Sequence, residues 1–171
     1  QYPIPVDLTL SANRWQTVVF PEDLSEKQVE DYFGEGTLLA VMSTATPPHV
    51  NDEPMNYLVH FNTTGSVTKN QPMLIKPGMK DVRYTSDVSY VASDAILKAE
   101  HQEDEMTIRM IGICDEDHLL TDGQIYFRNY GDGNMRFFMY KEGDGKQVKV
   151  KRGKCIWEIL DANNNVVTNK A

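Results

Sequence analysis

The chain has 171 residues, 40% of them apolar, and its 25 acidic and 17 basic side chains give a formal net charge of −8. This length fits one domain, and such a chain buries roughly 70% of its unfolded surface, so it needs no metal or disulfide to fold. The acidic balance argues against nucleic acid or an anionic membrane as the main partner, because binding phosphate needs clustered Lys and Arg.

No stretch of the sequence approaches the roughly 20 apolar residues of a membrane-spanning helix, so a spanning segment is not expected. The chain opens with Gln1 and has no initiator Met. We therefore expect a mature exported product or an excised domain, from which any export signal has been removed.

The chain begins with two predicted strands. Apolar and polar residues alternate over 8–12 and again over 15–20, which is the pattern of a half-buried strand. Asn13 and Arg14 predict the turn between them. Pro21 ends the second strand, because proline cannot donate to a ladder of hydrogen bonds.

A short helix follows, and the sequence predicts it over 26–33. Ser25 with Gln28 three residues later forms a capping box, and Gly34 is suited to end the helix with a positive φ. The predicted buried stripe has i, i+3, i+4 spacing and consists of Val29, Tyr32 and Phe33.

The rest of the chain reads as short strands separated by turns. We predict strands at 37–43, 57–61, 72–76, 106–111, 124–128, 135–141, 147–151 and 155–160, and one or two strands within 82–91. A proline-rich loop is expected over 46–54, hairpin turns at 131–134 and 143–146, and a solvated loop or hairpin tip over 95–105. The tail after Leu160 is expected to form a turn and a frayed or connecting end.

Short strands at this spacing favour a mainly β fold. We predict an antiparallel β-sandwich with one short helix at its edge or end. The sandwich spans 1–171 as a single domain, either the whole protein or one module of a larger surface protein.

Two cysteines, Cys114 and Cys155, lie in apolar strand-like runs. They could form a disulfide between neighbouring strands in an exported protein, or remain buried free thiols that pack as small apolar side chains. They lack the CxxC spacing of a zinc site.

The acidic loop after Cys114 holds the metal-ligating candidates Asp115, Asp117 and Asp122, with His118 among them. These groups could bind a cation such as Ca²⁺ or act as an acid/base pair. The spacing does not match a calcium-binding loop, so an exposed acidic loop is the alternative. His101 among its acidic neighbours allows the same two interpretations, and His60 within a strand predicts a half-buried residue.

Aromatic residues supply the candidate ligand-binding side chains, namely Tyr126, Phe138 and Tyr140. Alternation along a strand sends the rings of consecutive aromatic residues to opposite faces, and an outward ring could stack on a sugar or anchor a protein. The alternative is that both faces are covered within the fold. The basic run 146–154 alternates with valines and predicts the outward face of a strand.

Three blocks resemble a secreted or surface β-sandwich module of Bacteroidetes proteins. They are the L-x-A-N-x-W-x-T strand, turn and helix over 8–37, the P-x-L-I-K-P strand over 71–77, and the late G-K strand over 153–159. The resemblance implies an extracellular, largely β accessory or adhesion-type module. Most members of the family have no assigned activity, and the resemblance brings no catalytic residues.

The chain departs from the family pattern at three places. The Leu-Pro-Phe turn is replaced by Phe20, Pro21 and Glu22, and tyrosines of the family are replaced by Met73 and Ile156. These changes leave the predicted fold intact.

The function predicted from the sequence is a non-catalytic module, extracellular, at the cell surface or periplasmic, that acts in adhesion, surface assembly or protein binding. A glycan-binding module that uses exposed aromatics is the alternative, and a hydrolase that uses carboxylates is a third hypothesis. No G-x-S-x-G elbow, catalytic triad or phosphate-binding glycine loop occurs, so no catalytic residue or cofactor is predicted. The expected partner is a protein or glycan.

Overall fold

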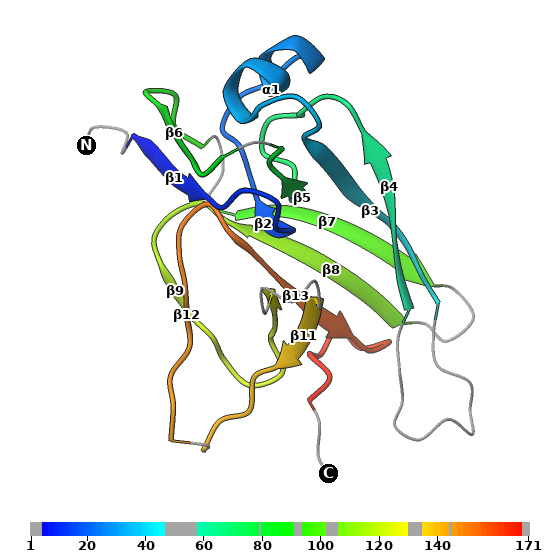
Figure 1. Cartoon of the computed structure of the whole chain (residues 1–171). Coiled ribbons are helices and arrows are strands. Elements are labelled where there is room, and N and C mark those ends of the chain that lie inside the picture. Colours follow the sequence, from blue (N-terminus) through cyan, green and yellow to red (C-terminus); the bar gives the residue numbers. More distant parts are fainter. Residues whose placement is uncertain are drawn as a thin grey trace.

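The structure is a computed structural model, and it describes residues 5–46, 58–78, 80–90, 94–101, 106–129, 135–143 and 145–168. The fold is mostly β, with antiparallel sheets and a single short helix, and it is sandwich-like as the sequence predicts (Figure 1).

Two larger sheets form the body of the fold. The first has the strand order β2 (Gln16–Val18), β5 (Met73–Lys76), β3 (Leu38–Thr46), β4 (Leu58–Thr64). The second has the order β11 (Met135–Met139), β10 (Ile125–Asn129), β13 (Cys155–Leu160), β8 (Met106–Ile113), β7 (Asp94–His101).

Two short ribbons and the helix cover the sheets. One ribbon pairs β1 (Val6–Leu10) with β6 (Val82–Ser86), and the other pairs β9 (His118–Leu119) with β12 (Lys149–Val150). The helix α1 spans Glu26–Phe33.

Alternation along the central strands distributes apolar side chains to both sheet faces. In β5, Met73 and Ile75 pack with residues of β1, β6 and α1, while Leu74 packs toward the five-stranded sheet. In β13, Trp157 faces the four-stranded sheet and Ile156 faces the opposite side. The central strands are therefore buried on both faces, which is why β13 is buried along its whole length.

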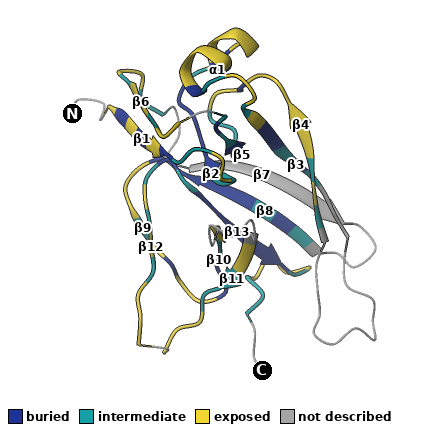
Figure 2. Ribbon diagram, in the orientation of Figure 1, coloured by how far each residue is buried: buried dark blue, intermediate teal, exposed yellow. Residues whose placement is uncertain are grey.

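The result is a stack of layers, in which α1 and the β1–β6 ribbon cover the four-stranded sheet, the five-stranded sheet follows, and the β9–β12 ribbon covers its far face. Figure 2 shows β8 and β13 largely buried, whereas α1 exposes most of its surface. The central strands are thus covered on both faces, whereas Phe137 on the outer strand β11 is 49% exposed.

The helix forms as predicted. The Ser25 hydroxyl accepts a hydrogen bond from the Gln28 backbone nitrogen at 3.2 Å, the Gln28 side chain accepts one from the Ser25 nitrogen at 2.9 Å, and Gly34 follows with φ 99°. Val29 and Phe33 are buried, but the prediction is wrong for Tyr32, which is 47% exposed. An eight-residue helix that lies on a sheet buries a narrow stripe, and Tyr32 falls at its edge.

The predicted loop over 95–105 is wrong for its first part, because 94–101 forms strand β7. This strand pairs with β8 over its whole length, from Asp94 opposite Ile113 to His101 opposite Met106. Pairing with a neighbouring strand decides its conformation, and a local pattern cannot show that. For the segment 82–91 the sequence predicts one or two strands, and its described part, 82–90, has one, β6, which ends at Ser86.

Several predicted loops fall on residues that are not described. The loop over 46–54 lies outside the described residues apart from Thr46, which ends β3, and the turn at 131–134 lies wholly outside them. Both cysteines are buried free thiols. Among the described residues, no helix is long and apolar enough to cross a membrane.

Candidate functional site

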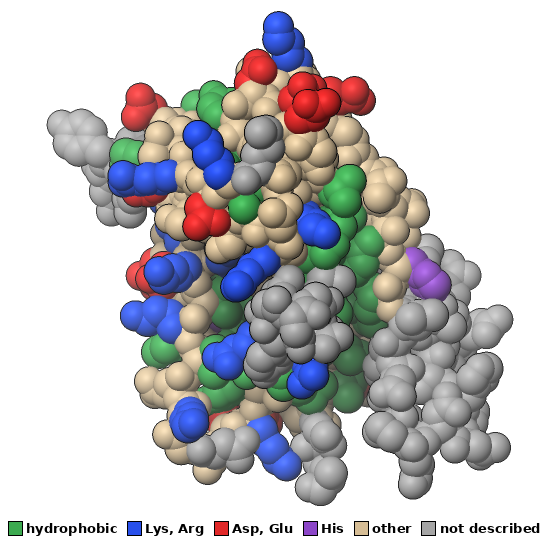
Figure 3. Space-filling view, viewed as in Figure 1, with side chains coloured by type: hydrophobic (Ala, Val, Ile, Leu, Met, Phe, Trp, Pro, Cys, Tyr) green, Lys and Arg blue, Asp and Glu red, His purple; other side chains and the backbone are tan. Residues whose placement is uncertain are grey.

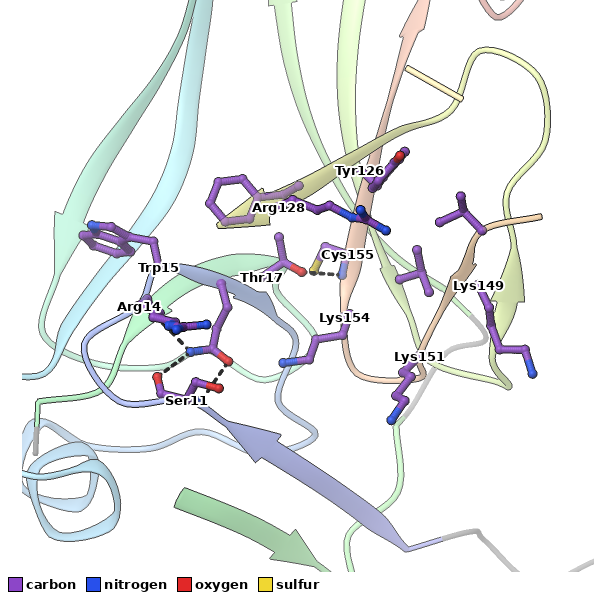
Figure 4. Close-up of a pocket in the computed structure, with 14 residues that line it drawn as sticks. Ser11, Arg14, Trp15, Thr17, Tyr126, Arg128, Lys149, Lys151, Lys154 and Cys155 are labelled. Atoms are coloured by element: carbon purple, nitrogen blue, oxygen red, sulfur yellow. Dashed lines mark hydrogen bonds between the residues drawn. The ribbon is translucent and has the colours of Figure 1, made fainter. Parts of the chain in front are cut away.

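A pocket of about 330 Å³ opens between three segments that are far apart in the sequence. They are the turn and start of β2 (residues 11–17), the middle of β10 (residues 126–128), and the stretch from β12 into β13 (residues 148–155). Figure 4 shows this arrangement, which we call the basic pocket. Its volume lies at the lower end of the range for small-molecule sites, about 300–1,000 Å³.

The first side of the pocket is a turn held by one side chain. The Gln16 amide accepts a hydrogen bond from the Ser11 nitrogen at 3.1 Å and donates to the carbonyls of Ser11 at 2.9 Å and Arg14 at 3.0 Å. Asn13 supplies the positive φ of 57° that the turn requires. This network fixes the backbone from which Arg14 and Trp15 project.

The base of the pocket is where the two sheets meet. The Cys155 backbone nitrogen donates to the Thr17 hydroxyl at 2.9 Å, and the Val19 nitrogen donates to the Gly153 carbonyl at 2.9 Å. Gly153 has φ 93°, and a Cβ there would collide with the Leu8 side chain, so both the turn and the close packing require glycine. Lys154 follows directly and reaches the pocket.

Five positively charged side chains line this pocket, and none of its lining residues is acidic: the cations are Arg14, Arg128, Lys149, Lys151 and Lys154. None of the five forms an ion pair with another described residue. Figure 3 shows many Lys and Arg side chains over the left and centre of one face, with a few acidic side chains at the left among them and several more at the top, around α1. The local charge is thus opposite to the net charge of −8.

Lys154 is the most enclosed of these cations. Desolvation lowers the pKa of its ammonium group to about 8, and the charge of Lys151 acts in the same direction. Cys155 beside it is fully buried, and burial raises the pKa of its thiol to about 12, so it remains protonated at neutral pH.

Of the three aromatic residues predicted to bind a ligand, Tyr126 lines the pocket, while Phe138 and Tyr140 are not among its lining residues. Phe138 stacks on Tyr126 at a centroid distance of 5.5 Å, and the Arg128 guanidinium lies over the Tyr126 ring, 5.6 Å from its centroid. The Tyr140 hydroxyl donates to the Lys146 carbonyl at 3.1 Å. Because Tyr126 already contacts these neighbours, its main effect on the pocket is to hold Arg128.

The three aspartates of the acidic loop do not converge on a common point where they could bind a metal ion. Asp117 accepts a hydrogen bond from the Arg152 nitrogen at 2.9 Å, Asp122 accepts one from the Glu142 nitrogen at 3.2 Å, and Asp115 is exposed. Within the described ranges, no three His, Cys, Asp or Glu side chains are grouped as a metal ion would require.

His118 instead belongs to a polar network behind the five-stranded sheet. Its Nε2 lies 2.8 Å from the Gln124 Oε1, and the Gln124 amide donates to buried Glu158 at 2.9 Å. Arg109 donates from Nε to Glu158 at 2.7 Å and forms a second, shorter bond to the same oxygen. This network satisfies a buried carboxylate.

The cations of the pocket were the part that sequence reasoning missed. The run 146–154 was visible, but it predicted an outward-facing strand; only Lys149 and Val150 form a strand there, and three lysines of the run line the pocket. Arg14 and Arg128 carry no local signal, because their proximity to the run depends on the folded arrangement.

Comparisons of this chain with protein-family models, curated proteins and solved structures find no match. The resemblance to the Bacteroidetes surface module therefore stays a prediction.

Proposed function

We propose that this protein is a non-catalytic binding module that acts outside the cell, and that the basic pocket binds a short segment of a surface glycan. The observation that carries the proposal is the pocket itself, where side chains from three separate segments converge on one opening of about 330 Å³. A pocket of this size with a few converging polar groups is the usual form of a small-ligand site.

The composition of the pocket favours binding over turnover. Its described lining contains no Asp, Glu or His, the residues that most often act as general acids and bases. The Cys155 thiol is held protonated by burial, which removes its nucleophilic form. Trp15 is half-buried at one end of the pocket, where an aromatic ring can pack against the apolar face of a sugar.

The extracellular location is supported by the resemblance of three sequence blocks to a secreted surface module. A glycan at the cell surface is the partner that fits both this location and the pocket.

A protein partner is the second candidate, and Phe137 is the observation that favours it. This residue lies on β11, at one end of the five-stranded sheet, and is 49% exposed although it packs on Trp157 with a centroid distance of 4.9 Å. An exposed aromatic residue on an edge strand is a possible anchor for another chain.

The test is retention on immobilised polysaccharides, acidic and neutral, compared between wild type and Ser11→Trp. Ser11 lines the pocket, so an indole there would fill it. The control is Thr9→Trp, at an exposed position on β1 that is not among the lining residues. We expect wild type and Thr9→Trp to be retained on at least one polysaccharide and Ser11→Trp to pass through.

Retention of Ser11→Trp equal to wild type, or no retention of a folded wild type on any polysaccharide, would contradict the proposal. Release of reducing ends from a retained polysaccharide would show that the module is an enzyme. Sedimentation of wild type and Phe137→Ser as a function of concentration tests the protein-binding candidate for the case of self-association.

A further inference from the structure

The basic pocket concentrates positive charge in a protein whose net charge is negative. The whole chain has 25 acidic and 17 basic side chains, yet five of the basic ones line this single pocket without an acidic neighbour in its lining. Such clustering of like charges raises the energy of the empty site through mutual repulsion. An anion in the pocket would remove that repulsion.

We expect the unfavourable energy of the empty pocket to be greatest at Lys154. Its backbone is fixed where the sheets meet by the hydrogen bonds of its two neighbours. The Gly153 nitrogen donates to the Ile113 carbonyl and the Gly153 carbonyl accepts from the Val19 nitrogen, while the Cys155 nitrogen donates to the Thr17 hydroxyl. Partial removal of an ammonium group from water is unfavourable unless an anion or acceptor compensates for the lost hydration. No described residue forms an ion pair with Lys154.

Three of the other cations, Arg14, Arg128 and Lys151, lie around this group and come from different parts of the chain. Figure 4 shows Lys154 extending from the start of β13 toward the turn that carries Ser11 and Arg14, with Arg128 and Lys151 on either side, whereas Lys149 points away at the outer edge. Arg128 is oriented by its contact with Tyr126. An oxyanion near the Lys154 ammonium would therefore approach positive charge from Arg14 on the turn before β2, from Arg128 on β10 and from Lys151 directly after β12.

We propose that the basic pocket binds an acidic saccharide, with a carboxylate or sulfate group placed against Lys154 and the sugar ring toward Trp15. This inference rests on the proposed function and names the ligand class of that same site. The volume of about 330 Å³ exceeds the space that a bare oxyanion needs and fits one or two sugar units. Nucleic acid is a poorer fit, since its backbone needs a continuous basic tract rather than one pocket.

Binding should depend on pH through Lys154. The charged or titratable groups around it are Arg14 on the turn before β2, Tyr126 and Arg128 on β10, Lys151 directly after β12, and the Cys155 thiol, while Lys149 on β12 lies at the outer edge. Because desolvation lowers the pKa of Lys154 to about 8, the free protein loses this proton above that pH, and an anion then has to bind with proton uptake. The affinity should be constant below pH 7 and fall by up to about tenfold per pH unit above 8.

The experiment is calorimetric titration at pH 6.5 and low salt with trigalacturonate, and with galactotriose as the neutral counterpart. A sulfated disaccharide, sodium sulfate and sodium phosphate form separate arms. We expect the best acidic saccharide to bind at least about tenfold more tightly than galactotriose and than either inorganic anion, since a charge-assisted hydrogen bond contributes about that factor. Added salt should weaken it.

Lys154→Met removes the ammonium but keeps an apolar stem, and it should lower the affinity for the acidic saccharide about tenfold and abolish the decline above pH 8. The matched control is Lys27→Met on α1, which is exposed and outside the pocket lining, and it should change neither. If Lys154→Met does not fold, the exposed pair Lys151→Met with Arg128→Gln should weaken binding in the same direction.

The outcomes separate this inference from the proposed function. Equal affinity for galactotriose and trigalacturonate, with loss of both in Ser11→Trp, would overturn acidic recognition and leave a glycan-binding pocket. Inorganic sulfate or phosphate binding as tightly as any saccharide would overturn sugar recognition. Absence of binding to every saccharide would remove both proposals.

Discussion

The aromatic cluster under α1 and the basic pocket differ in whether their enclosed polar groups have partners within the described part of the protein. Under α1, the rings of Phe20, Phe33 and Tyr84 pack against one another at centroid distances of 5.1–6.2 Å. The one polar atom among the rings, the Tyr84 hydroxyl, donates to Glu22. In the basic pocket, by contrast, like charges converge on Lys154 and no acidic residue lines the site.

This difference indicates that the aromatic cluster contributes to the stability of the fold, whereas the basic pocket contributes to binding. The aromatic cluster under α1 is complete without a ligand, so its residues should contribute to folding alone. In the basic pocket, the enclosed ammonium group of Lys154 forms no ion pair with a described residue. It should therefore lower the stability of the empty protein and stabilise the complex with an anion. Such a conflict between stability and activity is common at binding sites.

The largest effect should come from the aromatic cluster. Phe33 is 1% exposed, and Phe33→Ala should lower the free energy of unfolding by about 3–5 kcal/mol, through lost burial and the cavity that remains. Tyr32→Ala on the same helix turn is the control and should cost about 1 kcal/mol, the value of its ring contacts. Urea denaturation measures both, and equal losses would show that the cluster is not the core of this region.

The buried carboxylate of Glu158 is paired with Arg109, and this pairing contrasts with Lys154, which forms no ion pair with a described residue. Arg109→Met leaves the carboxylate of Glu158 with only the Gln124 amide as a partner, and it should cost about 2 kcal/mol, less than for a fully buried pair because Arg109 is partly exposed. Arg83→Met removes the exposed pair with Asp7, and its unfolding midpoint should match wild type. Equal midpoints for the two variants would contradict this interpretation of the Glu158 network.

Lys154→Met should act in the other direction and stabilise the empty protein at pH 7. Because the folded state lowers the pKa of Lys154 from 10.5 to about 8, the penalty is fully present below pH 8, where Lys154 is charged in both the folded and unfolded states. Between pH 8 and 10.5 the unfolded chain binds the proton more strongly, so the stability of wild type rises with pH.

The gain from Lys154→Met should therefore be about 2 kcal/mol at pH 7 and shrink as the pH approaches 10. Lys27→Met controls for the general loss of one charge. Thermal unfolding across this pH range measures the difference, and destabilisation by Lys154→Met at every pH would mean that the ammonium already has a compensating partner.

The smallest of the effects concerns the helix end beside the aromatic cluster. Ser25→Ala removes the hydroxyl that accepts from the Gln28 nitrogen, and it should cost about 1 kcal/mol. Ser25→Asp keeps an acceptor and should restore most of this loss. A loss as large as that of Phe33→Ala would show that folding of α1 depends on the cap rather than on packing.

The sequence predicted those elements whose signals are local. The capping box of Ser25 and Gln28 and the apolar run at 155–160 needed no knowledge of distant residues, and the structure has both the helix and the strand there. Strand β7 had to be found through its pairing with β8, which no local pattern contains.

The pocket could not be predicted for the same reason. Its residues come from 11–17, 126–128 and 148–155, and only the fold brings these segments together. The direction of Lys154 depends on the positive φ of Gly153 and on the shortness of β12, so the basic run alone favoured an outward face. Tyr126, which the sequence singles out as an aromatic residue on a predicted strand, is one of the residues that line the pocket.

The most direct test is an NMR titration of the Lys154 side chain, followed through its Cε and Nζ resonances with and without trigalacturonate. The structure predicts a pKa near 8 in the free protein, which rises when the acidic saccharide binds because the anion stabilises the charged form. A pKa at the ordinary value of lysine in the free protein, unchanged by the saccharide, would contradict a desolvated ammonium group without an ion pair to any described residue, on which the proposed ligand depends.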